Sequence, residues 1–289
     1  MVKKIGEKAF YRCSSLTYIR IPKYVREIGV DAFSFSGITQ VELHDWLRVY
    51  DYAFSNCKEL TLIVIPSTDY TKAFPGCSKI KHVLFSNPLT KIGDLAFNGF
   101  SAMTEFEIPD TVKEIGNKAF QKTQITSLVI PESVRKIEFD AFCGSSITEV
   151  KWPVSLKTIT GFFGNKELKE ISIPSTVNAI GNNAFGNCRN LMSVHIPNGV
   201  TSIGDDAFNG CESLVTITLP DSLTEIGERA FWNCHSLCSI NIPKGVNMIP
   251  GFVGCENLKT VKISRELHKK FSKCFSEGTE FLFYDDILN

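Results

Sequence analysis

The fold is decided by one stretch of sequence, Ile203-Gly204-Asp205-Asp206-Ala207-Phe208-Asn209-Gly210-Cys211-Glu212-Ser213-Leu214-Val215-Thr216-Ile217-Thr218-Leu219-Pro220. Its first six residues follow the pattern Ile-Gly-x-x-Ala-Phe, which occurs seven times, at 5–10, 28–33, 92–97, 115–120, 180–185, 203–208 and 226–231. A second pattern, an apolar-x-apolar triplet usually followed by Pro, recurs every 20 to 23 residues. Such a period is typical of repeat proteins, so we predict one uninterrupted array of about 13 units over residues 1–289.

Each unit contains the pattern of a short strand. In the clearest copy, buried-type residues Ile217 and Leu219 are separated by a polar one, which is the alternation of a strand with one buried face. Pro220 then ends the strand because proline has no N–H to donate. After the turn, a second short apolar segment reaches Ile226, and Phe231 is expected to fold inward.

One Phe occupies the same point of every unit, and we predict that these rings stack into a continuous column. The column consists of Phe10, Phe33, Phe54, Phe74, Phe97, Phe120, Phe142, Phe162, Phe185, Phe208, Phe231, Phe252 and Phe271. A single unit could not bury its own Phe, so stability is expected to come from the stacking of neighbouring units.

Eight of the ten cysteines stand three residues after a column Phe: Cys13, Cys57, Cys77, Cys188, Cys211, Cys234, Cys255 and Cys274. Elsewhere this slot holds Phe100 or Asn165, or the unit is interpreted as one residue shorter, as after Phe33, Phe120 and Phe142. We predict buried thiols that donate weak hydrogen bonds to carbonyl groups. Disulfides between coils about 4.8 Å apart and a metal site remain alternatives, although a row of thiols without a C-x-x-C pair disfavours metal. Cys143 and Cys238 do not stand three residues after a column Phe, and we expect them at the surface.

Charge and hydropathy exclude several classes of partner. The 31 basic residues cancel the 31 acidic ones, so no net field favours nucleic acid or an anionic membrane surface. The apolar runs, such as residues 62–65, are far shorter than the roughly 20 residues of a membrane-spanning helix. We therefore expect no nucleic-acid partner and no direct membrane insertion.

The stretch 203–220 closely resembles the repeat of the BspA-like leucine-rich repeat proteins of bacterial and protist cell surfaces, and the resemblance extends over nearly the whole chain. It implies a β-rich leucine-rich-repeat solenoid, a right-handed coil with a continuous parallel sheet on one face, short second strands and turns on the others, and little helix. It also implies adhesion or host binding at an extracellular or cell-surface location. The compressed units near Tyr70, Gly161 and Gly251 depart from the pattern, and their curvature is left open.

No motif for catalysis is found. The five histidines, His44, His82, His195, His235 and His268, belong to no nucleophile–base pattern and are interpreted as surface or turn residues. The sequence has no G-x-G-x-x-G, phosphate-binding loop or G-x-S-x-G motif. We therefore expect no catalytic, cofactor-binding or metal-binding residues, and a protein that is not an enzyme.

Binding is expected on the exposed face of the sheet, because the inward residues are committed to the core. In the N-terminal half this face holds aliphatic side chains beside carboxylates, the composition of a protein-binding patch. The candidate binding face is Leu62, Val64, His82, Leu84, Glu105, Glu107, Val129, Glu149 and Lys151. The alternative is that β-propensity alone places Val and Leu there, or that a loop covers them.

The function expected from these features is a non-catalytic scaffold that binds a protein or glycan on host or neighbouring cells. The alternative is a structural spacer that carries another domain away from the cell, in which case reversing charges on the face has no effect. The chain opens in the middle of a repeat without a signal peptide, so we expect a segment of a longer protein. We also expect a monomer.

Overall fold

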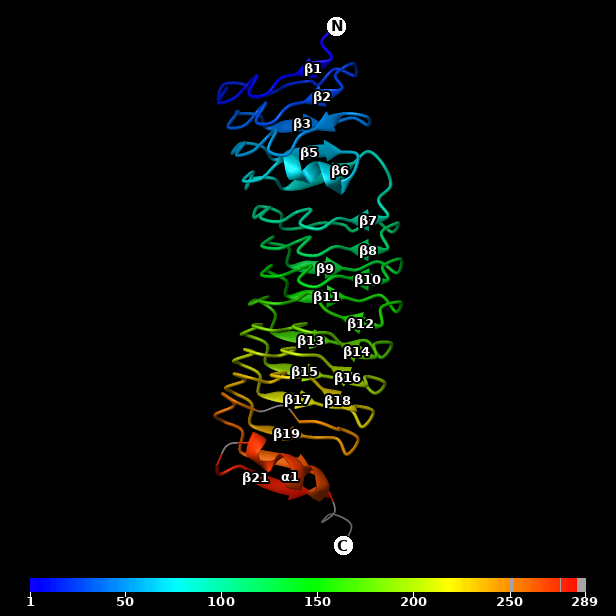
Figure 1. Ribbon diagram of the computed structural model, residues 1–289, viewed down its shortest axis with the longest axis vertical. Helices are drawn as coiled ribbons and strands as arrows, with labels where there is room; N and C mark the ends of the chain where they lie inside the picture. The colour runs from blue at the N-terminus through cyan, green and yellow to red at the C-terminus, as the bar shows by residue number, and fades with distance from the viewer. Residues whose placement is uncertain (250–251, 276, 285–289) are drawn as a thin grey trace.

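A computed structural model describes residues 1–249, 252–275 and 277–284 of the chain (Figure 1). It is an elongated stack of coils, with the first and last described residues at opposite ends. Each coil contributes short strands that pair in parallel with the equivalent strands of neighbouring coils. The predicted solenoid of about 13 repeats with little helix is confirmed.

The longer strands come from the apolar-x-apolar triplets. They are β3 (Gln40–Glu42), β5 (Leu62–Ile65), β6 (His82–Phe85), β9 (Ser127–Val129), β11 (Glu149–Lys151), β13 (Glu170–Ser172), β15 (Ser193–His195), β17 (Thr216–Thr218), β19 (Ser239–Asn241), β20 (Thr260–Ile263) and β21 (Glu280–Phe283). Their register follows the sequence period, because Val41 pairs with Ile63 and Ile63 with Val83. The first and third residues of a triplet point into the core and the residue between them points outward, as at Ile217, Thr218 and Leu219.

A second set of strands lines another side of the coils, and each spans two residues. They are β1 (Lys4–Ile5), β2 (Glu27–Ile28), β4 (Arg48–Val49), β7 (Lys91–Ile92), β8 (Glu114–Ile115), β10 (Lys136–Ile137), β12 (Thr158–Ile159), β14 (Ala179–Ile180), β16 (Ser202–Ile203) and β18 (Glu225–Ile226). The helices are also short: η1 (Thr68–Ala73), α1 (Arg265–Phe271) and η2 (Ser272–Cys274) have six, seven and three residues. The compressed unit at Gly161 keeps its second strand, β12, whereas the unit at Tyr70 forms η1 in place of one. Gly251, in the third compressed unit, lies outside the described residues.

The column of Phe rings forms the core, with one error at its C-terminal end. From Phe120 to Phe252, successive rings stack with centroids 5.2 to 5.9 Å apart. The prediction that Phe271 continues the column is wrong, because Phe271 ends helix α1 and Phe275 stacks on Phe252 at 5.0 Å instead. Residues that form the turn in a regular unit form helix α1 here. The ring that stacks in the column therefore comes four residues later, at Phe275 instead of Phe271.

Six thiols of the cysteine slot are buried and donate to the carbonyl oxygen of the Phe in the preceding coil. They are Cys57, Cys77, Cys188, Cys211, Cys234 and Cys255, with Sγ–O distances of 3.0 to 3.3 Å. The prediction of burial is wrong for Cys13, which is exposed in the first coil of the described stack. Cys274 is only partly buried, beside the helical end of the stack.

The units after Phe33, Phe120 and Phe142 are one residue shorter between the Phe and its strand, as expected, because Val41 follows Phe33 by eight residues whereas its partner Ile63 follows Phe54 by nine. The slot is nevertheless present in these units, and it holds a hydroxyl. The hydroxyl of Ser145 donates to the Phe120 carbonyl at 2.7 Å, the bond that a thiol makes elsewhere. Ser36 and Thr123 are likewise buried in their slots. Any small side chain with a donor therefore fits this position.

Candidate functional site

The nine residues of the candidate binding face all lie at the surface of the stack, but they do not form one continuous strip. Leu62 and Val64 are half-buried, and the exposed members are His82, Leu84, Glu105, Glu107, Val129, Glu149 and Lys151. The register places Leu62 opposite His82 and Val64 opposite Leu84. Leu84 and Val129 keep 55% and 54% of their surface exposed, so no loop of this chain covers them.

The sheet is interrupted in the middle of this face. Strand β6 pairs with β5 alone and ends its sheet, and residues 104–108, where the next strand is expected, are not in a strand. Among the described residues, no backbone hydrogen bond joins 66–89 to 91–110. Figure 1 shows this break as the gap between β6 and β7. The expected continuous sheet is therefore divided, although the strands on each side keep their register.

The cause of the break lies in η1. The coil that follows β5 forms this helix, whose first turn is capped by the Ser67 side chain, and so offers no second strand to β7. In the described part of the chain, only two hydrogen bonds cross the break, and each involves a side chain. Thr68 Oγ1 accepts from the Gly93 N–H at 3.0 Å, and Ser101 Oγ donates to the Ser78 carbonyl at 3.4 Å. The sequence signal was the missing Ile-Gly in this unit.

Aromatic rings fill the interior at the break. Among the described residues, no ring contact joins Phe74 to Phe97, so the predicted continuous column is interrupted here. Phe85 and Phe106, which come from the triplets, take up the space, with ring centroids 6.4 and 4.8 Å from that of Phe97. The two parts of the stack are therefore joined mainly by apolar packing.

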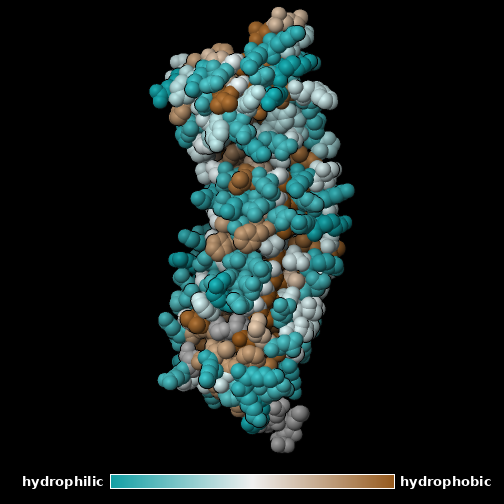
Figure 2. All heavy atoms as spheres, viewed as in Figure 1, coloured by the Kyte–Doolittle hydropathy of each residue, from teal (hydrophilic) through white to brown (hydrophobic). Residues whose placement is uncertain are grey.

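A groove of about 1090 Å³ runs along the break on the outer surface. Five residues of the candidate face line it, namely His82, Leu84, Glu105, Glu107 and Val129, together with Lys81 and Asp110. Glu149 and Lys151 lie on β11, outside the groove. Figure 2 shows a mostly hydrophilic surface on the side viewed, with hydrophobic residues gathered in small separate patches.

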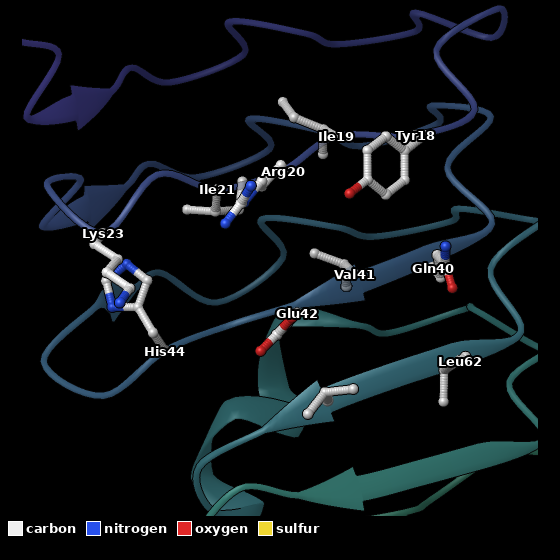
Figure 3. A pocket seen from close by; sticks show the side chains of 11 residues that line it. Tyr18, Ile19, Arg20, Ile21, Lys23, Gln40, Val41, Glu42, His44 and Leu62 are labelled. Atoms are coloured by element: carbon white, nitrogen blue, oxygen red, sulfur yellow. The ribbon is translucent and has the colours of Figure 1, made fainter.

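A second, smaller hollow of about 410 Å³ adjoins the first on the N-terminal side (Figure 3). Figure 3 shows Tyr18, Gln40 and Leu62 at one end, Lys23 and His44 at the other, and Arg20 and Glu42 between them. Leu62 and Val64 of the candidate face belong here. The other lining residues are not in the candidate binding face, because that face was predicted from exposed aliphatic residues. Strand alternation does predict that Arg20 and Glu42 point outward.

The charge of the groove is mainly acidic. Glu105, Glu107 and Asp110 are exposed at its edge, and none of them forms an ion pair in the described part of the chain. On the opposite edge, His82 is the first residue of β6 and Lys81 precedes it. A ligand that brings positive charge to the acidic edge would meet carboxylates that no neighbour neutralises.

No group of three or more His, Cys, Asp or Glu side chains that could hold a metal occurs in the described ranges. Burial raises the pKa of the Cys188 thiol to about 12 and that of the Cys211 thiol well above its ordinary value, so both stay protonated at neutral pH. What the surface offers is hydrogen bonding, charge and apolar contact.

Comparison with known protein families identifies the repeat. Residues 1–71, 69–192 and 178–282 match the BspA type leucine rich repeat region in six copies. The chain belongs to the BspA-type leucine-rich repeat family. The resemblance of the repeats to BspA-like proteins is thereby confirmed. No curated protein matches this leucine-rich repeat chain.

A solved structure of another leucine-rich repeat protein has the same fold. The leucine-rich repeat chain is similar to a leucine-rich repeat protein from Bacteroides ovatus, with 26% identity and a TM-score of 0.71 over 98% of this chain and 75% of that chain. It is also similar to a leucine rich cell surface protein from Faecalibacterium prausnitzii, with 22% identity, a TM-score of 0.47 and coverage of 98% and 83%. The described part of this family member contains no helix of the length and apolarity needed to cross a membrane.

Proposed function

We propose that this chain is a non-catalytic recognition scaffold that binds a protein or glycan at the surface of a microbial cell. The observation that carries the proposal is the groove beside β6, where Leu84 and Val129 stay exposed next to Glu105 and Glu107. Exposed aliphatic side chains rimmed by charge are typical of surfaces that a partner covers. The cell-surface location is proposed from the family, whose repeats resemble those of bacterial and protist surface proteins.

The rigidity of the flanking strands supports a binding role. Four residue pairs hold β6 against β5, and three hold β9 against β11. A ligand that binds between them orders little of the protein, so its contacts are not offset by a large loss of conformational entropy. The absence of a catalytic role is part of the proposal, and the wide separation of the histidines along the stack supports it.

The test is a binding screen of the chain against immobilised extracellular-matrix proteins, mucins and glycans. It is run beside a groove variant, Leu84→Asp, Glu107→Lys and Val129→Asp, whose net charge equals that of the native chain. All three side chains are exposed, so we expect the variant to fold and to lose binding by about tenfold or more.

The matched control carries Glu170→Lys, Ser172→Asp and Thr218→Asp, the same change of charge on exposed positions of β13 and β17. Circular dichroism checks that both variants are folded. Binding that survives in the control and is lost in the groove variant would support the proposal. Binding that both variants keep would move the site elsewhere, and the absence of any ligand would favour the spacer.

A further inference from the structure

The free edge of β6 presents backbone groups to the groove. The N–H groups of His82 and Ser86 donate to Thr61 and Ile65, on the β5 side. Alternate residues of a parallel strand direct their backbone groups to opposite sides. The N–H and C=O groups of Val83 and Phe85 therefore point away from β5, toward the groove, and both residues line it.

The opposite side of the groove is also unpaired. Residues 104–108 form no backbone hydrogen bond among the described residues, although the equivalent residues of β9 pair with β11. A strand edge with free donors and acceptors is a template for another extended chain. Such an edge is used by proteins that bind peptides as an added strand, in which backbone bonds give affinity and alternate side chains give specificity.

The charges beside the edge select the kind of chain. Glu105 and Glu107 are two residues apart and both exposed, so they present a pair of carboxylates with the spacing of alternate residues along a strand. Neither has an ion-pair partner in the ranges that the structure describes. An added strand with basic side chains at alternate positions would place its charges along this row.

We infer that the groove binds an extended polypeptide segment with lysine or arginine at alternate positions, which adds as a strand to the free edge of β6. The inference rests on the proposed function and narrows its partner to a polypeptide. The partner does not need to be folded for this kind of binding, so a linear peptide is expected to reproduce it.

The probe is a display library of linear ten-residue peptides, selected against the whole chain. We expect the enriched peptides to carry lysine or arginine at alternate positions. Affinities are then measured with the selected peptide in solution by fluorescence polarisation. Enrichment of acidic or patternless sequences, or no enrichment at all, would overturn the inference.

Strand addition has a signature that a merely electrostatic contact lacks. Two forms of the selected peptide are N-methylated, one at its odd positions and one at its even positions. Because only alternate N–H groups face β6, one form should bind at least about tenfold more weakly and the other should bind like the parent. Equal binding of both forms would show that the peptide does not pair with the strand edge.

Charge reversal gives the second arm. The variant Glu105→Lys with Glu107→Lys should bind the selected peptide about tenfold more weakly. The control Glu170→Lys with Glu280→Lys makes the same change on β13 and β21, outside the groove, and should bind normally. Equal loss in the two variants would indicate a general field effect and contradict the inference.

The outcomes separate this inference from the function on which it rests. Suppose that a matrix protein or glycan binds the native chain and not the groove variant, while N-methylation of the peptide has no effect on peptide binding. The proposed function would then stand, and strand addition would be wrong. Light scattering of the chain alone shows whether a second copy occupies the edge, and a dimer that the Glu105→Lys, Glu107→Lys variant abolishes would replace the peptide as occupant.

Discussion

The thiol of Cys211 lies 3.2 Å from the carbonyl oxygen of Phe185, 26 residues earlier and one coil back. The same oxygen accepts the backbone N–H of Cys188 at 3.1 Å. The Cys211 thiol therefore adds a second bond to a carbonyl that already has one, and it ties two neighbouring coils together at the Phe turn.

Replacing Cys211 with Ala should lower the free energy of unfolding by about 1–2 kcal/mol, because it removes a weak hydrogen bond and leaves a small cavity. Cys211→Ser should cost less, since Ser145 makes the equivalent bond. Urea unfolding followed by circular dichroism measures both, with exposed Cys238→Ala as the control. A serine variant less stable than the alanine variant would contradict this account.

The break in the ladder should be visible in hydrogen exchange. Amides of residues 104–108 should exchange much faster than those of β9, because they lack backbone acceptors whereas β9 is paired with β11. Mass spectrometry of peptic fragments measures both segments in one sample. Similar protection of the two segments would mean that the sheet continues across β6 in solution.

Asp206 and Arg229 form a two-bond ion pair between neighbouring coils, with Oδ1–Nε and Oδ2–Nη2 distances of 2.9 and 2.6 Å. The hydrogen bonds from Arg229 lower the pKa of the Asp206 carboxyl. A carboxyl with a lowered pKa stabilises the fold above its ordinary pKa and loses that contribution as the pH falls through the lowered value.

Arg229→Met should therefore lower the melting temperature at pH 7 slightly, by less than Cys211→Ala does, because the pair is partly exposed and screened. The difference between the variant and the native chain should shrink at an acidic pH below the ordinary aspartate pKa of about 3.9, because the contribution of ionised Asp206 is lost as the pH falls through its lowered pKa. Melting curves at the two pH values measure it. A difference that grows on acidification would contradict the lowered pKa.

The thiols should divide into two classes of reactivity. Exposed Cys13 and Cys238 should react with iodoacetamide in the native chain, whereas Cys188 and Cys211 should react only after unfolding. Burial both blocks the reagent and raises the pKa of the latter two thiols, which removes the reactive thiolate. Mass spectrometry of the labelled protein identifies the modified positions, and native labelling of Cys211 would show that the coils open.

The sequence was informative wherever the repeat is regular. The position of Phe208 in its unit predicted a buried ring between two others, and the structure stacks it between Phe185 and Phe231. The slot of Cys211 predicted its burial and a hydrogen bond to a carbonyl group, although not which carbonyl accepts it. Both predictions depend only on contacts between adjacent coils, which the period of the sequence determines.

The errors occur where one unit departs from its neighbours. Whether residues 68–73 form a helix or a strand is decided by packing against the adjacent coils, and the short sequence does not reveal it. The free edge of β6 follows from that helix, so the groove could not be predicted, although Leu84 and Glu107 beside it could. Phe271 was misplaced for the same reason, because helix α1 changes the count of residues per turn.

The break beside β6 also has a mechanical consequence. When a stack of coils is pulled at its two ends, every interface carries the same load, and the one with the fewest hydrogen bonds yields first. In this chain that interface is crossed by two side-chain hydrogen bonds, from Gly93 to Thr68 and from Ser101 to Ser78, and by no backbone bond between 66–89 and 91–110 in the described residues. Tension would thus separate the molecule into two intact rods joined by a flexible tether, and would expose the edge of β6 as it did so.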